Sequence, residues 1–238
     1  MDEVKIEDIV KGVEQKLHDN LEKYHEILKE EIGKKIYTTY KTDPQTAAKL
    51  FLQVINLPIK VFREILGDKK LNYGSASGII REWLFYYIID AAITEKHLED
   101  KIKVFNNYSL PYKWKSNKRM HKEVNIDIVV GEIQKREPTK LRKLFYCMEI
   151  KTNFNDGFER YYEQQSMLYH QRTKVYPKFL YYYVYFYSPP SSNPKMDKKV
   201  KLLKKRQELW CFPPNTIDDT EINNSKEFLD RIYEPFKK

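Results

Sequence analysis

Three residues suited to hydrolytic chemistry stand near the ends of two strand-like runs. In EVNIDIVV (123–130) and KLFYCMEI (143–150), hydrophobic residues alternate with others. This pattern predicts strands whose successive side chains point to opposite faces. It places Asp127 on one face of the first strand and Glu149 and Lys151 together on one face of the second. The polar stretch between the runs is compatible with a hairpin, so Asp127 and Glu149 are expected to converge.

Two converging carboxylates repel each other unless a cation lies between them. Their hard oxygen atoms suit Mg²⁺, with Mn²⁺ as a substitute. The backbone carbonyl of Ile150 would be a third ligand, and Lys151 would position a metal-activated water. Such a site suits phosphodiester hydrolysis, because it combines a metal, a nucleophilic water and positive charge for the transition state. The alternative is a solvated strand end that carries Asp127, Glu149 and Lys151 by chance.

The order of Asp127 and the Glu-Ile-Lys sequence at 149–151, on a strand–hairpin–strand unit followed by a helix, resembles the PD-(D/E)XK nuclease superfamily. The resemblance covers roughly residues 78–187, and Ile126 stands where the family pattern has Pro. It implies a restriction-endonuclease-like core and a Mg²⁺-dependent endonuclease for double-stranded DNA, most of all a type II restriction endonuclease. A homodimer would then match a palindromic site. A companion DNA methyltransferase in the cell is implied by the resemblance alone.

Glu82 extends this resemblance to a preceding helix. It shares a face with Phe85 and Ile89, where a carboxylate is costly unless it is paired or bound to a metal. The superfamily often has an acidic residue on the helix before its first core strand, so Glu82 is a candidate catalytic residue and metal ligand. The alternative is a salt bridge with Arg81 or another cation.

Gln165 is a weaker candidate. Gln165 and Tyr169 resemble the Q-x-x-x-Y element of the exonuclease branch of the superfamily. Gln165 would then act indirectly, through the residues that hold the metal. The alternative is a glutamine whose hydrogen bonds are satisfied within the core.

The charge of the chain favours a nucleic-acid partner. Lys and Arg number 43 against 34 Asp and Glu, a formal net charge of +9. Residues 101–122 are rich in Lys and Arg and contain no acidic residue. Side chains that could contact phosphates there are Lys113, Lys115, Lys118, Arg119 and Lys122, and Asn117 or Arg119 could reach base edges. The alternative for the net charge is that it serves solubility. The alternative for residues 101–122 is a solvated loop.

Several functional classes lack their sequence patterns. No GxxxxGKS, GxGxxG or HExxH sequence is present, and ATP hydrolysis and a nicotinamide-binding fold have no support. The two cysteines form no CxxC pair. The longest apolar run, at 179–187, is too short to span a bilayer as a helix, and no signal-peptide pattern is seen. We therefore expect a cytoplasmic protein without a membrane partner.

The elements that must position these residues follow from hydrophobic spacing. Helices are predicted at 3–35, 44–56, 58–66, 78–93, 157–172, 196–207 and 225–236. Strands are predicted at 101–108, 123–130, 143–150, 178–187 and 208–212. This order predicts an α/β fold with a central mixed sheet flanked by helices.

Two domains are expected from the same pattern. Residues 1–70 would form a helical region that supports dimerisation or embraces DNA, unless its apolar stripe docks on the body of the protein. Residues 71–238 would form the nuclease core. Two other functions stay open: another nuclease of the superfamily (repair, junction-resolving or exonuclease), and a nucleic-acid-binding protein without catalysis.

Overall fold

The chain folds into two compact units. The computed structural model describes residues 6–66, 75–110, 114–116, 119–121, 123–154, 157–175, 179–187, 194–213 and 217–237. The first unit comprises residues 1–97 and 212–238, and the second comprises 98–211. The compact units therefore divide at different places from the expected boundary at residue 70. The roles expected for the two domains stay predictions.

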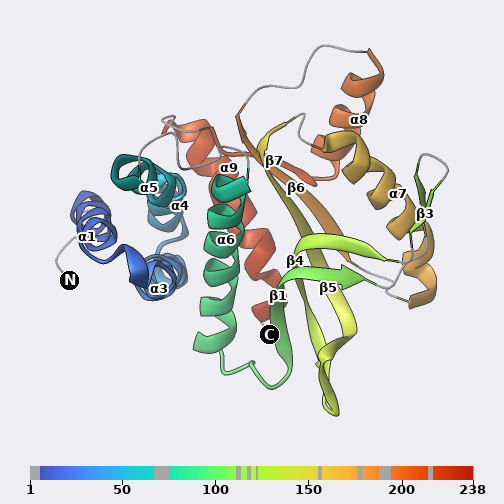
Figure 1. The fold of residues 1–238 in the computed structure, drawn as a ribbon, viewed down its shortest axis with the longest axis horizontal. Coiled ribbons are helices and arrows are strands. Elements are labelled where there is room, and N and C mark those ends of the chain that lie inside the picture. Colours follow the sequence, from blue (N-terminus) through green and yellow to red (C-terminus); the bar gives the residue numbers. More distant parts are fainter. Residues whose placement is uncertain are drawn as a thin grey trace. The chain divides into compact units, whose positions relative to one another are not determined.

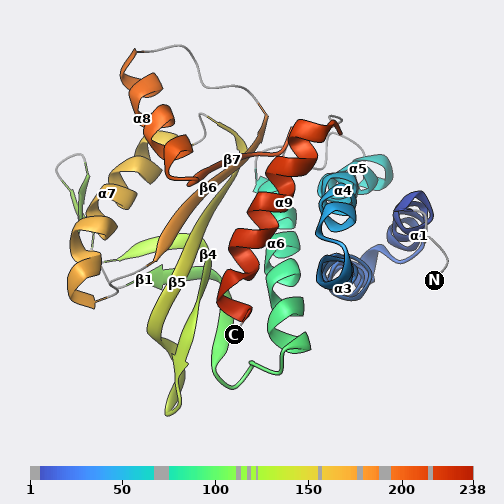
Figure 2. The same cartoon turned by 180° about the vertical axis from the view of Figure 1, so that it is seen from behind.

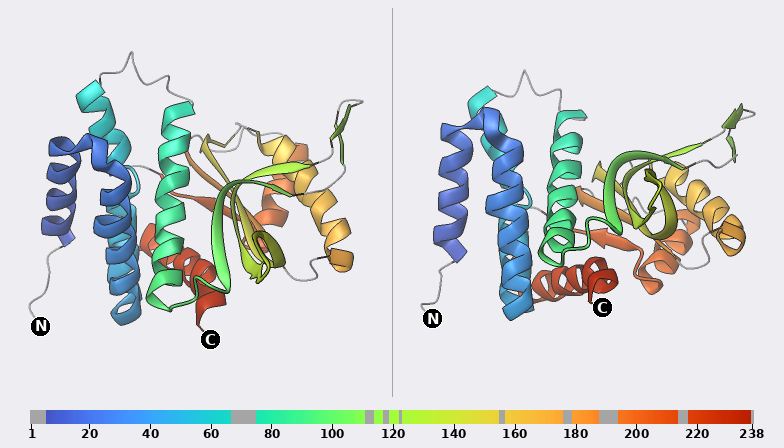
Figure 3. Two further views of the ribbon diagram at one scale, coloured as in Figure 1. Left: turned by 60° about the horizontal axis from the view of Figure 1, so that its bottom comes forward. Right: turned by 90° about the horizontal axis from the view of Figure 1, so that it is seen from below.

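The first unit is helical in the part that is described (Figures 1 and 3). Its elements are α1 (Ile6–Asp19), η1 (Leu21–Lys23), α2 (Tyr24–Ile27), the π-helix η2 (Leu28–Gly33), α3 (Lys34–Thr42), α4 (Pro44–Val54), α5 (Leu57–Leu66), α6 (Ser75–Glu95), α9 (Asp219–Tyr233) and η3 (Glu234–Phe236). Asp43 caps α4 by accepting hydrogen bonds from the amides of Gln45 and Thr46.

Helices α6 and α9 belong with the N-terminal helices in this unit. The Tyr87 hydroxyl of α6 lies 3.1 Å from Nδ1 of His25, and the Tyr233 hydroxyl of α9 donates to the carbonyl of Ile88 at 3.3 Å. Helix α6 is apolar nearly all round, so it can pack against several helices at once. This packing explains why the first unit extends beyond residue 70.

The second unit is built on a five-stranded mixed sheet (Figures 1 and 2). Its strands are β1 (Ile102–Leu110), β4 (Val124–Gln134), β5 (Glu137–Asn153), β6 (Leu180–Tyr187) and β7 (Leu209–Cys211), in that spatial order. The first three strands pair antiparallel, and β5, β6 and β7 pair parallel. The chain thus has the α/β class with a helix-flanked mixed sheet that the sequence predicts.

Helices α7 (Phe158–Val175) and α8 (Pro194–Lys205) cover one face of this sheet (Figure 2). The core on that face includes Cys147 and Tyr183 from the sheet, Tyr161 and Leu168 from α7, and Leu203 from α8. Cys147 is fully buried. Because β5 is alternating, the face that carries Cys147 also carries Glu149 and Lys151.

Two details of the strands differ from the sequence prediction. The stretch 131–143 is largely paired rather than a loop, because β4 and β5 are joined at a tight turn. Within the basic segment, β2 (Trp114–Ser116) and β3 (Arg119–His121) form a short antiparallel ribbon.

Among the described helices, none combines the length and the apolar character needed to cross a membrane.

The register of β4 against β5 decides whether the two carboxylates meet. Ile128 pairs with Met148, and the next position in this register sets Asp127 opposite Glu149. The register shifts at Gly131, where β5 contains one additional residue. Without this β-bulge, the register on the turn side of Gly131 would set Asp127 opposite Met148 instead of Glu149.

Alanine at Gly131 is expected to destabilise the fold by about 2 kcal/mol or more. An added Cβ would lie 2.2 Å from the backbone carbonyl oxygen of Lys143 and 3.2 Å from the Cα of Leu144. Neither backbone atom can move without disturbing the bulge. Urea unfolding measures the loss. The matched control is Gly12→Ala in α1, where a Cβ meets nothing within 4 Å and should stabilise by roughly 0.5–1 kcal/mol. Equal stability of the two variants would contradict this account.

Candidate active site

Asp127, Glu149 and Lys151 come together on β4 and β5. The Lys151 ammonium nitrogen lies 2.9 Å from Oδ2 of Asp127 and 2.9 Å from Oε1 of Glu149. The backbone amide of Ile150 donates to the same Oδ2 of Asp127 at 2.7 Å. The convergence that strand alternation predicts is therefore present, with the ammonium bridging the two carboxylates.

The three side chains differ in their access to solvent. The side chain of Glu149 is 7% exposed, whereas Asp127 is 13% and Lys151 is 24% exposed. Gly157, next to the first residue of α7, has a φ of +86°, a conformation that side chains rarely adopt. A Cβ at Gly157 would lie 3.7 Å from the Cε of Lys151, so the helix start lies beside the lysine. The site is thus open toward Lys151 and closed behind Glu149.

The electrostatics of the site favour an additional cation. Two carboxylates and one ammonium leave one net negative charge in a largely buried place. Burial and the charge of Asp127 raise the pKa of Glu149, and Lys151 and Arg160 oppose this. Burial alone would lower the pKa of Lys151, but the charges of Glu149 and Asp127 outweigh it and the pKa is raised. Lys151 therefore stays protonated, and Glu149 is the carboxylate whose ionisation is penalised.

The free energy of unfolding of the metal-free protein should depend on pH through the raised pKa of Glu149. Because its folded-state pKa is raised, the folded chain holds this proton over a pH range in which the unfolded chain has lost it. Relative to Glu149→Gln, the free energy of unfolding should fall as pH rises from the ordinary carboxyl pKa through the raised value. Each tenfold difference in proton affinity corresponds to about 1.4 kcal/mol. Urea unfolding in EDTA between pH 4 and pH 8 measures this, and a difference that is flat or grows with pH would refute it.

The remaining candidate metal ligands are the backbone carbonyl of Ile150 and the side chain of Glu82. The Ile150 side chain is buried while its amide holds Asp127, and its carbonyl stays a predicted ligand. Glu82 is half-buried on α6, in the first unit, and its participation stays a prediction. Arg81, the alternative partner named for Glu82, is buried and donates from Nη2 to Oδ1 of Asn56 at 3.1 Å.

Gln165 is buried in a network behind the sheet. Its amide nitrogen lies 2.7 Å from the hydroxyl of Tyr161, 3.3 Å from the carbonyl of Tyr181 and 3.0 Å from Oε2 of Glu208. Tyr169 also donates to Glu208. These contacts fit the satisfied core glutamine that the sequence left open, and the indirect role of Gln165 at a metal stays a prediction.

The sequence did not single out two residues that form a buried polar chain with Glu149, namely Tyr181 and Gln164. The hydroxyl of Tyr181 on β6 lies 3.3 Å from Oε2 of Glu149 and 3.5 Å from Oε1 of Gln164 on α7. Gln164 had a signal in the sequence, since it lies three residues after Tyr161 and four before Leu168 on the helix face that packs on the sheet. Tyr181 alternates with other aromatic residues on β6, so only its contacts single it out.

The proposed DNA contacts fall mainly outside the described residues. Lys113, Asn117, Lys118 and Lys122 lie there, and so do the side chains of Lys115 on β2 and Arg119 on β3. Among the described side chains, basic residues are exposed on α7 and α8, namely Arg160, Lys198, Lys201, Lys204 and Lys205. Arg160 is near enough to Glu149 to oppose the rise of its pKa.

Two other charged groupings lie in the first unit. Within the described chain, Glu14, His18 and Glu64 form one cluster of potential metal-ligating atoms that lie within 4.8 Å of one another. Lys60 already pairs with Glu14 at 2.6 Å and with Glu64 at 3.9 Å, which explains the cluster as an ion-pair network. The sequence did not indicate this cluster, because α5 supplies Glu64 to residues of α1.

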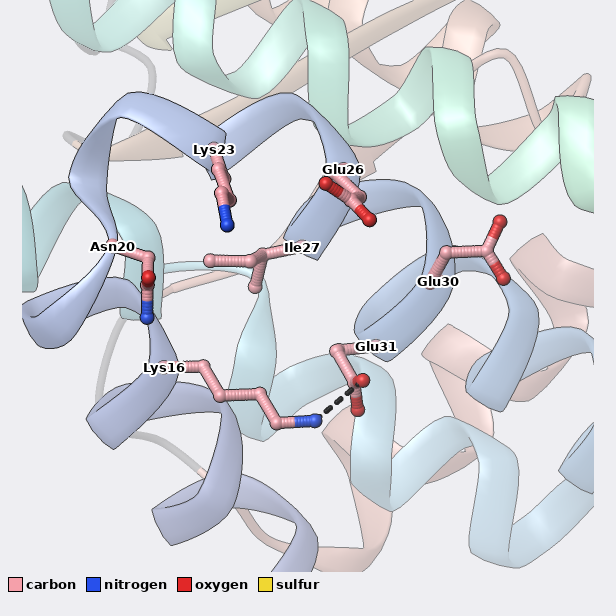
Figure 4. A pocket seen from close by; sticks show the side chains of 7 residues that line it. All are labelled: Lys16, Asn20, Lys23, Glu26, Ile27, Glu30 and Glu31. Atoms are coloured by element: carbon pink, nitrogen blue, oxygen red, sulfur yellow. Dashed lines mark hydrogen bonds and ion pairs between the residues drawn. The ribbon is translucent and has the colours of Figure 1, made fainter.

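A hollow of about 250 Å³ lies in the same unit (Figure 4). It is lined by Lys16, Asn20, Lys23, Glu26, Ile27, Glu30 and Glu31. An ion pair of 2.5 Å joins Lys16 to Glu31 within this lining (Figure 4). Its mixed charges do not point to one class of ligand.

Protein-family models, curated protein sequences and solved structures all gave no match to the chain.

Proposed function

We propose that this protein is a Mg²⁺-dependent endonuclease that hydrolyses phosphodiester bonds of double-stranded DNA. The observation that carries the proposal is the contact of Lys151 with both Asp127 and Glu149 on adjacent strands. A type II restriction endonuclease, with a restriction-endonuclease-like core, is the class that the order of these residues resembles.

The donor set fits a hard divalent cation. Asp127 and Glu149 would hold Mg²⁺ or Mn²⁺ through carboxylate oxygens, with the Ile150 carbonyl and Glu82 as further candidates. The net negative charge of the triad supports this, because a divalent ion would offset the repulsion that raises the pKa of Glu149. When bound, the metal would polarise a phosphate oxygen and lower the pKa of a coordinated water.

Lys151 would supply a positive charge that stays in place throughout the reaction. Its ammonium now lies between the carboxylates and is the most exposed of the three groups. Small rotations of its flexible side chain would let Nζ donate to the attacking water or to a non-bridging phosphate oxygen. The raised pKa keeps this donor protonated at neutral pH.

Double-stranded DNA is the proposed substrate because the chain is basic. The formal charge is +9, and exposed lysines lie on α8, a helix of the same unit as the triad. The homodimer and the companion methyltransferase are proposals that rest on the resemblance to type II enzymes. An internal ion-pair network without catalysis is the competing explanation, since a bridging ammonium partly neutralises the carboxylates.

The test is incubation of the purified chain with plasmid and phage DNA in Mg²⁺, with EDTA as the control. Discrete fragments would support a restriction enzyme, whereas digestion from ends or of branched DNA would favour another nuclease of the superfamily. DNA binding without cleavage, together with no Mn²⁺ binding in calorimetry, would overturn the proposal in favour of a non-catalytic nucleic-acid-binding protein.

A further inference from the structure

A buried polar chain lies behind Glu149, on the side away from Lys151. The Tyr181 hydroxyl is 3.3 Å from Oε2 of Glu149 and 3.5 Å from Oε1 of Gln164. Glu149, Tyr181 and Gln164 are 5%, 0% and 1% exposed. The amide nitrogen of Gln164 is buried and has no hydrogen-bond partner within the described part of the chain. An unpaired buried amide is costly, so its presence calls for an explanation.

The hydroxyl of Tyr181 has one proton for two acceptors. An ionised carboxylate is the stronger acceptor, so this proton belongs on Oε2 of Glu149. The Gln164 amide can then turn over about its terminal bond and donate from Nε2 to the lone pair of the Tyr181 oxygen. The result is a continuous chain from the Gln164 amide through Tyr181 to Glu149, in which every donor points toward the carboxylate.

This chain gives the two oxygens of Glu149 different roles. Oε2 faces the Tyr181 hydroxyl, and Oε1 faces Lys151 at 2.9 Å, on the side of Asp127. We propose that Tyr181 and Gln164 are positioning residues that hold the Glu149 carboxylate with Oε1 turned toward Asp127, where the divalent cation binds. The inference rests on the proposed function, because it assigns a purpose to the same metal site.

A purely structural role accounts less well for these residues. Gln164 lies on the face of α7 that packs into the core with Tyr161 and Leu168. A methionine or leucine would fill that place without burying an amide. A polar pair there has a use in holding the carboxylate beside it in one orientation.

The experiment measures Mn²⁺ affinity by titration calorimetry on the full chain. Tyr181→Phe should weaken Mn²⁺ binding by roughly 10-fold to 100-fold, the range typical of residues that orient a metal ligand. Gln164→Met should weaken binding less. The double variant should lose less than the product of the two single losses, because both act through one chain.

The matched control is Tyr183→Phe, on the same strand and the same face. The Tyr183 hydroxyl is buried too, but it donates to the carbonyl of Phe154 at 2.7 Å. Tyr183→Phe should leave Mn²⁺ affinity unchanged. Thermal unfolding checks that each variant folds. Unchanged affinity in Tyr181→Phe, or an equal loss in Tyr183→Phe, would overturn the positioning role while the metal site stands. Absence of Mn²⁺ binding in the unmodified chain would overturn the proposed function and this inference together.

Discussion

Replacing Lys151 with alanine is expected to reduce DNA cleavage by about 10³-fold, the scale typical of losing one preorganised electrostatic donor. In EDTA the same variant should also lose roughly 3 kcal/mol of stability at neutral pH, as expected when one partner leaves a buried ion pair. The reason is that Asp127 and Glu149 would then face each other without the ammonium that bridges them. Mg²⁺ should restore much of this stability, because a cation would take the place of the ammonium between the carboxylates.

The measurements are a cleavage assay and urea unfolding with and without Mg²⁺. Lys151→Met serves as the matched variant, because it keeps most of the side-chain volume and removes only the charge. It should behave like alanine in cleavage and in its response to Mg²⁺. A variant that cleaves normally would rule out a catalytic role for Lys151, and one that Mg²⁺ stabilises no more than the original chain would show that the ion binds elsewhere.

Replacing Asp127 with asparagine is expected to weaken metal binding strongly and to abolish cleavage, with little effect on the metal-free fold. Asparagine keeps an oxygen that can accept from the amide of Ile150, a bond that measures 2.7 Å in the present chain. The variant leaves one carboxylate and one ammonium, so the site loses its net negative charge. Mn²⁺ affinity should therefore fall by about 100-fold or more. This is at least as large as the greatest loss typical of removing a residue that only orients a metal ligand.

Calorimetry with Mn²⁺ and unfolding in EDTA provide the readouts. The metal-free stability of Asp127→Asn should stay within about 1 kcal/mol of the original, in contrast to Lys151→Ala. Asn125→Ala is the control, since Asn125 lies two residues earlier on the same strand, is exposed and accepts a hydrogen bond from Ser109. Retained Mn²⁺ binding in Asp127→Asn, or an equal loss in Asn125→Ala, would place the metal outside the proposed site.

The local sequence predicted the elements of the second unit well. Alternation in β4 and β5 depends on neighbouring residues only, because a strand turns every second side chain to the same face. It therefore indicated that Glu149 and Lys151 share a face. The mixed sheet followed from the order of helical and alternating segments. The sequence did not predict where β5 begins, because the polar residues at 137–143 have the pattern of a loop but pair with β4.

Contacts between distant residues decided the rest. The register that sets Asp127 opposite Glu149 depends on the bulge at Gly131, where backbone atoms of β4 and β5 approach too closely for a side chain. The assignment of α6 to the helical unit came from its packing, since an apolar helix can be buried equally well in either unit.

Residues 145–154, FYCMEIKTNF, by themselves determined that a carboxylate and an amine lie together at one end of a buried strand. Only the tertiary structure decided that the amine of Lys151 bridges two carboxylates, and that Tyr181 and Gln164 lie behind Glu149. The physical reason is that side-chain direction is a property of the local backbone, whereas hydrogen bonds between strands and helices form only when distant segments pack.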